Sequence, residues 1–288
     1  KYDSLIGEEG YDVAIIDEAS QMIMPNSIGV LRLAKSHILV GDHHQQPPIL
    51  TNNEQTKLNK TLFQELFDND IIPESSKVML NTQHRMNPVL GSFISHEFYN
   101  GKLLNNSKIQ FKKIFEDTEA PTTIGKICNP DDIITIVDTK NISYDINLKS
   151  FEEDGEIILD IFKYMVDKNV NPLNIGIIAP YRAQVALIRR KINSLFNYAS
   201  PKLISNDIVD TVDRFQGDER DIIIFSVCVS DKNISKFLGD KRKINVALSR
   251  AKKKLVIVGN WNAATKYDVF KSLDNYVKDN KQSKLIRI

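Results

Sequence analysis

The chain has 288 residues, of which 42% are hydrophobic and 26% are charged, and its formal net charge is +1 at pH 7. This composition is ordinary for a globular protein and provides for one large domain or two modest ones. It excludes a membrane-spanning helix, because no apolar run is long enough, and the overall charge does not by itself indicate nucleic-acid binding.

The two cysteines, Cys128 and Cys228, lie far apart and form neither a disulfide framework nor a metal-ligand spacing. This usage indicates a reducing, intracellular compartment. Cys228 lies in an apolar run, so we expect it to be a core residue. The chain shows no signal peptide and begins at Lys1 rather than methionine, and we therefore expect it to be a fragment of a longer protein.

Short apolar runs rich in β-branched residues recur along the chain and alternate with amphipathic runs of helical period. The predicted helices are 56–69, 154–168, 181–196 and 261–278. Several apolar runs are continuous, which is typical of strands that are covered on both faces. Strands that alternate with helices predict an α/β fold with a parallel, doubly wound sheet. The predicted strands are 12–17, 37–42, 77–82, 132–138, 174–181, 206–211, 220–227 and 254–260.

A polar, proline-containing stretch near residue 75 follows the first complete helix and predicts a domain boundary. We therefore expect a short first α/β unit, residues 1–76, and a longer second one, residues 77–288. The irregular, polar stretch from 105 to 123 is interpreted as a loop or a small insertion.

The first candidate site follows the first strand, in the sequence YDVAIIDEAS. Asp17 and Glu18 stand at the carboxyl end of that strand, where nucleotide hydrolases hold magnesium and orient a water. Such sites also need a phosphate-binding loop, G-x-x-x-x-G-K-[ST], which the sequence lacks. Either the acidic pair carries no function, or it is one part of a larger site.

The second candidate site is VGDHHQQPP, residues 40–48, directly after another strand. Asp42 with His43 and His44 raises a metal site as an alternative. We consider it weak, because adjacent histidines on a turn are expected to point apart and no further ligand cluster is in sight. Gln45 is better suited to contact a phosphate oxygen or a water.

Three further segments complete the set, and we expect all five to lie where strands end, which is where open α/β sheets bind ligands. Arg85 lies in NTQHRMNP, and a short predicted helix presents Arg250 beside several lysines of a basic run, 239–254. Gln216, Gly217 and Glu219 lie in a polar turn between two strands. Each residue alone could be a surface charge. Together, in this order, they indicate phosphoryl transfer, in which arginines meet the developing charge.

The order of these motifs resembles the superfamily-1 helicases, in particular the branch of the nonsense-decay helicase and senataxin. IIDEASQ is similar to its Walker B segment, and LVGDHHQQPP to its G-D-x-x-Q-L-P-P motif. QHRMNP, VDTVDRFQGDERDIII and NVALSRAKKKLVIVGN resemble three later motifs of the branch. The similarity covers nearly the whole chain, and motifs of this length in this order are highly specific.

The resemblance implies two RecA-like (P-loop NTPase) domains, the first one truncated, that clamp ATP between them. It implies that Asp17 holds Mg²⁺ through water, that Glu18 orients the attacking water and that Gln45 senses the γ-phosphate. The remaining roles concern the second domain. Arg85 and Arg250 are implied as arginine fingers, Glu219 as the ligand of the ribose hydroxyls, His84 as the base-packing residue in place of an aromatic, and Gln216 and Gly217 as further nucleotide contacts.

The resemblance also implies a single strand of nucleic acid as partner, held mainly by its backbone. The candidate contacts are Pro48, Tyr181, Arg182, Gln184 and Thr211. An aromatic residue beside an arginine suits backbone and stacking contacts with a single strand.

Within this branch, the stretches 18–50 and 83–103 are most similar to the replication helicase–nucleases that trim Okazaki-fragment flaps, although senataxin-like proteins match the second stretch well too. The resemblance thus implies an ATP-dependent 5′-to-3′ helicase or translocase, leaning towards DNA, with a monomeric motor and a nuclear location. The alternatives are an RNA helicase and a degenerate binding scaffold. Because the phosphate-binding loop is absent, we expect this fragment alone to hydrolyse little ATP and to need the preceding part of the same protein.

Overall fold

The computed structural model describes residues 10–48, 60–69, 71–108, 111–116, 122–139, 150–195, 201–215, 217–231 and 235–288. The chain divides into two compact units, Lys1–Leu80 and Asn81–Ile288. The division falls a few residues after the boundary predicted between residues 76 and 77.

The first unit is built on two parallel strands, β1 (Tyr11–Ile16) and β2 (Ala34–Leu39). The short helix η1 (Ala19–Gln21) and α1 (Met24–Leu31) connect them. Two further helices follow, α2 (Leu62–Asp68) and η3 (Glu74–Ser76). Alternate β1 side chains, among them Ile15 with 70% of its surface exposed, form an uncovered apolar face within the described part of this unit.

The strand predicted over residues 77–82 is wrong, because only Thr82–Gln83 is a strand (β3). Residues 77–80 belong to no strand pair of the described structure, and the pairing with β4 begins at the oxygen of Asn81, which accepts from the Leu104 nitrogen. Val78 and Leu80 are 84% and 82% exposed, so their apolar side chains contribute no core. An apolar run becomes a strand only where a neighbouring backbone accepts its hydrogen bonds.

The second unit is dominated by a six-stranded sheet with the order β10-β5-β9-β8-β6-β7, in which every neighbouring pair is parallel. A separate parallel pair joins β3 to β4 (Leu104–Asn105). The parallel α/β fold predicted from the sequence is thereby confirmed. The strands of the large sheet are β5 (Ile134–Asp138), β6 (Ile175–Ala179), β7 (Val209–Thr211), β8 (Arg220–Ser226), β9 (Ala251–Gly259) and β10 (Ser283–Arg287).

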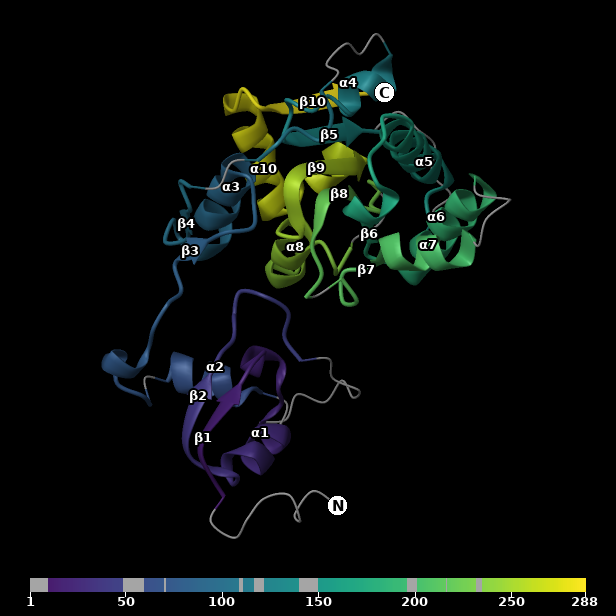
Figure 1. Ribbon diagram of the computed structural model, residues 1–288. Coiled ribbons are helices and arrows are strands. Elements are labelled where there is room, and N and C mark those ends of the chain that lie inside the picture. Colours follow the sequence, from purple (N-terminus) through teal and green to yellow (C-terminus); the bar gives the residue numbers. More distant parts are fainter. Residues whose placement is uncertain are drawn as a thin grey trace. The chain divides into compact units, whose positions relative to one another are not determined.

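Helices cover both faces of this sheet (Figure 1). On one side lie α3 (Pro88–Tyr99), α8 (Lys241–Leu248) and α10 (Asp268–Asp279), together with α9 (Trp261–Ala264). On the other lie α4 (Thr123–Ile127), α5 (Glu152–Asp167), α6 (Arg182–Leu195) and α7 (Pro201–Ile208), with the short η4 (Pro172–Asn174) before β6.

Continuous apolar strands supply both cores, because successive side chains point to opposite faces. In β8, Ile223 and Phe225 belong to the core under α3 and α10, whereas Ile222 and Ile224 belong to the core under α5 and α6. Cys228 is fully buried in the second of these cores, as expected.

Several elements differ from the prediction. The run 206–211 is divided between the end of α7 and the short β7, and the helix predicted over 261–278 is interrupted between α9 and α10. The strand β10 and the helix α4 were not predicted. Both are short. The strand β10 pairs with the edge of β5, and α4 packs on one face of the sheet. No helix in the described part of the chain is long and apolar enough to cross a membrane.

A buried lysine ties the loop before β5 to β9. The side chain of Lys254 has no exposed surface, and its Nζ donates to the backbone oxygens of Asn129 (2.9 Å) and Asp132 (2.5 Å) and to Thr135 Oγ1 (3.0 Å). Burial lowers the pKa of Lys254 to about 8, although Cys128 and Asp132 act in the opposite direction. The folded state therefore binds this proton more weakly than the unfolded state does.

We predict that Lys254 makes the unfolding free energy rise with pH. Between about pH 8 and 10.5 the unfolded lysine keeps a proton that the folded one has released, so alkaline pH favours folding at this site. Relative to Lys254→Met, the wild type should gain on the order of 3 kcal/mol across that window. Urea unfolding followed by the fluorescence of Trp261, the single tryptophan, measures both proteins. A difference that does not change with pH would contradict the shifted pKa.

Candidate functional site

In the first unit the acidic pair stands at the carboxyl end of β1. Glu18 adopts a left-handed backbone conformation (φ 53°) and begins η1. Its backbone nitrogen donates to Asp17 Oδ1 (2.9 Å), and Gln21 Nε2 donates to Glu18 Oε2 (2.5 Å). Asp17 and Glu18 are both exposed, so each keeps carboxylate surface open to a ligand.

The loop after β2 lies beside this pair because β1 and β2 are parallel and end at the same edge. The backbone nitrogen of Asp42 donates to Ser20 Oγ (3.2 Å), which joins the two loops. The carboxylate of Asp42 then accepts from the His44 backbone nitrogen and from Gln45 Nε2, both at 2.9 Å. Gly41 permits this approach, since a Cβ there would lie 2.9 Å from the Ser20 nitrogen.

The two histidines of this loop do not point apart, contrary to the prediction. The ring centroids of His43 and His44 are 4.0 Å apart, and His43 also packs 4.4 Å from the ring of Phe67. Burial is the main cause that lowers the pKa of His44. The adjacent His43 adds to this effect, and Asp42 opposes it. Aromatic packing holds the pair, and the described residues contain no cluster of three or more metal-ligating side chains.

The neighbouring Gln46 stands where the related motif has leucine, and it is buried with 3% exposure. Its Nε2 has no hydrogen-bond partner among the described residues. An unsatisfied buried amide costs about 1–3 kcal/mol. Pro48, predicted to contact nucleic acid, follows in the same loop and is half-buried.

In the second unit the predicted residues are divided between two edges of the sheet. Glu219 directly precedes β8 and Arg250 directly precedes β9, so both lie at the amino-terminal edge. Tyr181 and Thr211 lie at the opposite edge, where β6 and β7 end. The expectation that all five segments follow strand ends is therefore wrong for two of them. The sequence shows that a loop lies between two strands, but not which end of the sheet it occupies.

Two basic side chains from distant parts of the chain, Arg85 and Lys252, meet at the carboxylate of Glu219. We call these three residues the Glu219 cluster. Arg85 Nε lies 2.5 Å from Glu219 Oε2, and Lys252 Nζ lies 2.5 Å from Glu219 Oε1. Burial alone would raise the pKa of Glu219, but the ion pairs with Lys252 and Arg85 outweigh it and lower the pKa. About a third of each side chain is exposed, so the cluster is accessible to a ligand. Lys252 was not predicted, because it is one of three consecutive lysines.

A glutamine holds the loop that carries Arg85. Gln83 Oε1 accepts from the backbone nitrogens of Arg85 (2.8 Å) and Met86 (2.7 Å). Gln83 Nε2 donates to the Met86 oxygen (2.9 Å) and to Asn105 Oδ1 (2.7 Å). All four of its hydrogen-bonding positions are thus used. Asn105 lies in a stretch interpreted from the sequence as a loop, and only the pairing of β3 with β4 places it here.

The same loop is tied to β9 and presents His84. The backbone nitrogen of Asn87 donates to the oxygen of Lys252 (2.7 Å). His84 is exposed, and its Nδ1 lies 2.8 Å from Asn106 Nδ2. This contact orients the imidazole without covering it.

Arg250, the second predicted arginine finger, is 2% exposed. Its Nε donates to the oxygen of Val246 (3.0 Å), and its terminal nitrogens lie 3.4 Å from the oxygen of Asp218 and 3.3 Å from Ser249 Oγ. The guanidinium group therefore links the end of α8 to the loop before β8. In that loop Gly217 has a positive φ of 84°, whereas Gln216 lies outside the described residues.

Of the predicted nucleic-acid contacts in this unit, one has a different position from that expected. Arg182 is exposed and Thr211 is half-buried, while the hydroxyl of Tyr181 lies 2.9 Å from Ser235 Oγ. Gln184 is fully buried, and its Oε1 accepts from the Phe151 backbone nitrogen (2.7 Å). In this structure Gln184 therefore positions the start of α5, and its side chain has no exposed surface.

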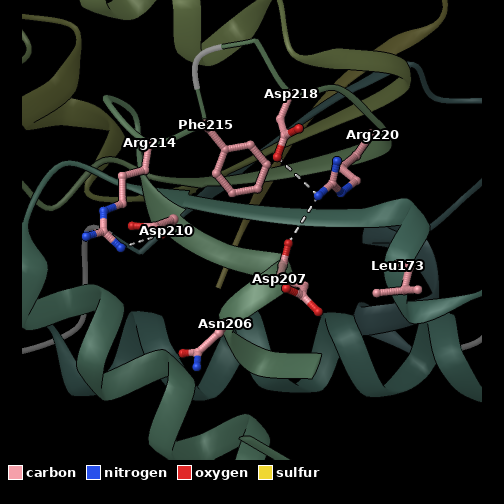
Figure 2. A pocket seen from close by; sticks show the side chains of 8 residues that line it. All are labelled: Leu173, Asn206, Asp207, Asp210, Arg214, Phe215, Asp218 and Arg220. Carbon is pink, nitrogen blue, oxygen red and sulfur yellow. Dashed lines mark hydrogen bonds and ion pairs between the residues drawn. The ribbon is translucent and has the colours of Figure 1, made fainter. Parts of the chain in front are cut away.

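A cavity of about 450 Å³ lies beside the loop that joins β7 to β8 (Figure 2). Its two arginines, Arg214 and Arg220, are each paired with an aspartate of the same lining, Asp210 and Asp218. Arg220 donates to the oxygen of Asp207 (3.1 Å), forms an ion pair with Asp218 (3.4 Å) and covers the ring of Phe215 at 5.6 Å. We therefore interpret these contacts as packing that shapes the loop leading to Glu219.

A family model described as AAA domain matches residues 58–262, and a second with the same description matches residues 2–53. The chain belongs to this AAA-domain family and, within it, to the superfamily-1 helicases.

Three curated relatives extend the comparison. The DNA replication ATP-dependent helicase/nuclease of Schizosaccharomyces pombe is 31% identical over 97% of this chain and 21% of its own length. An uncharacterized ATP-dependent helicase of Methanocaldococcus jannaschii is 34% identical, with coverages of 93% and 39%. A regulator of nonsense transcripts 1 homolog of Neurospora crassa is 33% identical, with coverages of 93% and 24%. The chain thus spans about a fifth to two fifths of these relatives.

We predict that Gly91→Ala destabilises the second unit. Alanine favours a helix such as α3, but its Cβ would lie 2.1 Å from Asn105 Oδ1 and 2.8 Å from Gln83 Nε2. Both side chains must move, and we expect a loss of about 1–3 kcal/mol in the unfolding free energy. Urea unfolding monitored by Trp261 fluorescence tests this. Gly239→Ala serves as the control, because its Cβ meets only ordinary contacts, and equal stability of the two variants would refute the prediction.

Proposed function

We propose that this chain is part of an ATP-dependent helicase or translocase that moves 5′ to 3′ along a single strand, with DNA as the preferred substrate. The observation that carries the proposal is the Glu219 cluster, in which Arg85, Glu219 and Lys252 meet from three segments far apart in sequence. Arginine and carboxylate at one accessible point suit a ligand with both phosphates and hydroxyl groups.

The first unit supplies acidic groups for the phosphate end of the nucleotide. Asp17 and Glu18 are exposed at the end of β1, and Gln45 lies in the adjacent loop. One or two carboxylates suit Mg²⁺, which usually keeps several waters and binds substrate phosphates as well. The ion would supply charge neutralisation at the phosphates. Asp17 would hold the ion, Glu18 would orient the attacking water, and Gln45 would contact the γ-phosphate.

The second unit supplies groups for the ribose and for the developing charge. Glu219 has a lowered pKa and stays ionised at neutral pH, so its oxygens accept hydrogen bonds from the ribose hydroxyls. His84 packs on the base, and Gln216 and Gly217, which lie next to Glu219 in the sequence, supply further nucleotide contacts. Arg85 exchanges Glu219 for phosphate oxygens, while Lys252 keeps the carboxylate partnered. Arg250 stabilises the negative charge that develops on the phosphate. For this, its guanidinium group must leave the backbone oxygens of Val246 and Asp218.

The substrate assignment is supported by relatives and by the opposite edge of the sheet. One relative is named for DNA replication and another for nonsense transcripts, so RNA is the alternative substrate. Tyr181, Arg182 and Thr211, with Pro48 of the first unit, are the proposed strand contacts. They mainly contact the backbone, which carries little sequence information. A monomeric motor acting in the nucleus completes the proposal.

An unwinding assay with the full-length protein, of which residues 1–288 are a part, tests the nucleic-acid substrate and the direction of movement together. Matched DNA and RNA duplexes, each with a 5′ or a 3′ overhang, should be opened in the presence of ATP and Mg²⁺. We expect the DNA duplex with the 5′ overhang to be unwound fastest. Preferential unwinding of RNA supports the alternative, and strand binding without any ATP hydrolysis indicates a degenerate scaffold. Residues 1–288 alone should hydrolyse little ATP, since they contain no phosphate-binding loop.

We predict that Arg85→Ala in the full-length protein lowers ATP hydrolysis stimulated by single-stranded nucleic acid roughly 10³-fold or more. This is the effect typical of an arginine finger. Arg85 is the better test of the two arginines, because Arg250 is buried and its removal endangers folding. Unchanged unfolding of residues 1–288 with the same substitution, followed by the fluorescence of Trp261, confirms that the variant is folded. Arg242→Ala, which removes an arginine from α8, should keep full turnover. Wild-type turnover by Arg85→Ala would remove Arg85 from the mechanism.

A further inference from the structure

A cavity of about 570 Å³ runs beside the outer strand of the large sheet, between α6 and β7. We call it the arginine groove, and its polar lining includes Arg182, Arg189, Arg190, Asp210, Thr211 and Arg214. Four arginines and one aspartate belong to this lining, so its formal charge is about +3 in a chain whose net charge is +1. Such a concentration of one sign attracts a polyanion.

Helix geometry aligns these arginines. Positions 182, 189 and 190 are seven and eight residues apart, so they lie on one face of α6. At 1.5 Å per residue the row is roughly 12 Å long. The row of arginines begins at the carboxyl end of β6, near Thr211, and runs along α6 away from the carboxyl-terminal edge of the sheet. The groove therefore extends the surface on which the strand contacts are proposed.

The arginines differ in how firmly they are held. Arg189 donates twice to the oxygen of Val209 (2.9 and 2.7 Å) and pairs with Asp210 at 3.0 Å, so it is part of the fold. Arg190 and Arg214 are 75% and 73% exposed, and each reaches its nearest carboxylate only at 3.8 Å. Ion pairs of this kind contribute about 0–1 kcal/mol, so phosphate oxygens can replace them.

We propose that the arginine groove binds phosphates of the single strand beyond the contacts at Thr211, with Arg190 and Arg214 as the additional phosphate ligands. The inference rests on the proposed function and adds a route for the strand along the β7 side of the second unit. Arginine suits this role because its planar fork matches a phosphate and its charge persists at every physiological pH.

An added protein strand fits this edge less well. The outer strand of a sheet can pair with a foreign strand through its unpaired backbone groups. In β7, however, Arg189 binds the oxygen of Val209, and the nitrogen of Thr211 donates to Asp210 Oδ1 at 2.7 Å. Side chains thus satisfy two of the backbone groups that a partner strand would need, while the positive charge stays exposed.

The test measures how the binding of single-stranded nucleic acid by the full-length protein depends on salt concentration. The probe is a fluorescein-labelled oligothymidylate of about 20 nucleotides, followed by anisotropy. Arg190→Ala with Arg214→Ala should weaken binding roughly tenfold and reduce the slope of log K against log salt by about 1.4, since each single-strand phosphate contact contributes about 0.7. ATP hydrolysis without nucleic acid should not change. Arg190→Lys with Arg214→Lys should restore most of the slope.

Arg287→Ala is the matched control, because it removes an exposed arginine from β10, at the opposite side of the same sheet. It should leave both affinity and slope at wild-type values. If the double alanine variant also keeps wild-type affinity and slope, the groove inference is overturned while the proposed function stands. If the wild type itself binds no strand, the proposed function fails and the inference fails with it. Unfolding of residues 1–288 with the same substitutions, followed by Trp261 fluorescence, verifies that each variant is folded.

Discussion

The parallel direction of all six strands in the large sheet is the constraint on which the rest of the second unit depends. Parallel strands put every loop that enters a strand at one edge and every loop that leaves a strand at the other. Glu219 and Arg250 enter β8 and β9, whereas Tyr181 and Thr211 leave β6 and β7. In the second unit, the proposed nucleotide groups of Glu219 and Arg250 are therefore separated from the proposed nucleic-acid contacts Tyr181 and Thr211 by the length of the strands.

At the amino-terminal edge, one carboxylate organises the charges. Glu219 accepts from Arg85 on one oxygen and from Lys252 on the other, and its lowered pKa reflects both. The pairs are partly exposed, so each is weak enough to be exchanged. Gln83 and Asn105 hold the Arg85 loop by neutral hydrogen bonds that do not depend on the ion pairs. Arg85 can thus change partners without loss of the loop that carries it.

The connection from β7 to β8 runs from one edge to the other, and it carries residues of both proposed sites. Arg214, at its start, lines the arginine groove, while Asp218, near its end, accepts a hydrogen bond from Arg250. Phe215 anchors the connection in the core with 3% exposure and lies under Arg220. This short, anchored segment physically connects the arginine groove to the loop that carries Glu219.

Patterns in the sequence are enough to predict a parallel α/β fold, the helices α5 and α6 and the segments that carry charge, because burial on both faces and helical period leave local signals. The motif order likewise identifies the family. Tertiary structure alone decides which edge of the sheet a loop occupies and that Gln184 is buried. It also decides that Lys252 shares Glu219 with Arg85 and that four arginines line one groove. These features depend on strand pairing and on contacts between residues up to 134 positions apart, for which no local pattern exists.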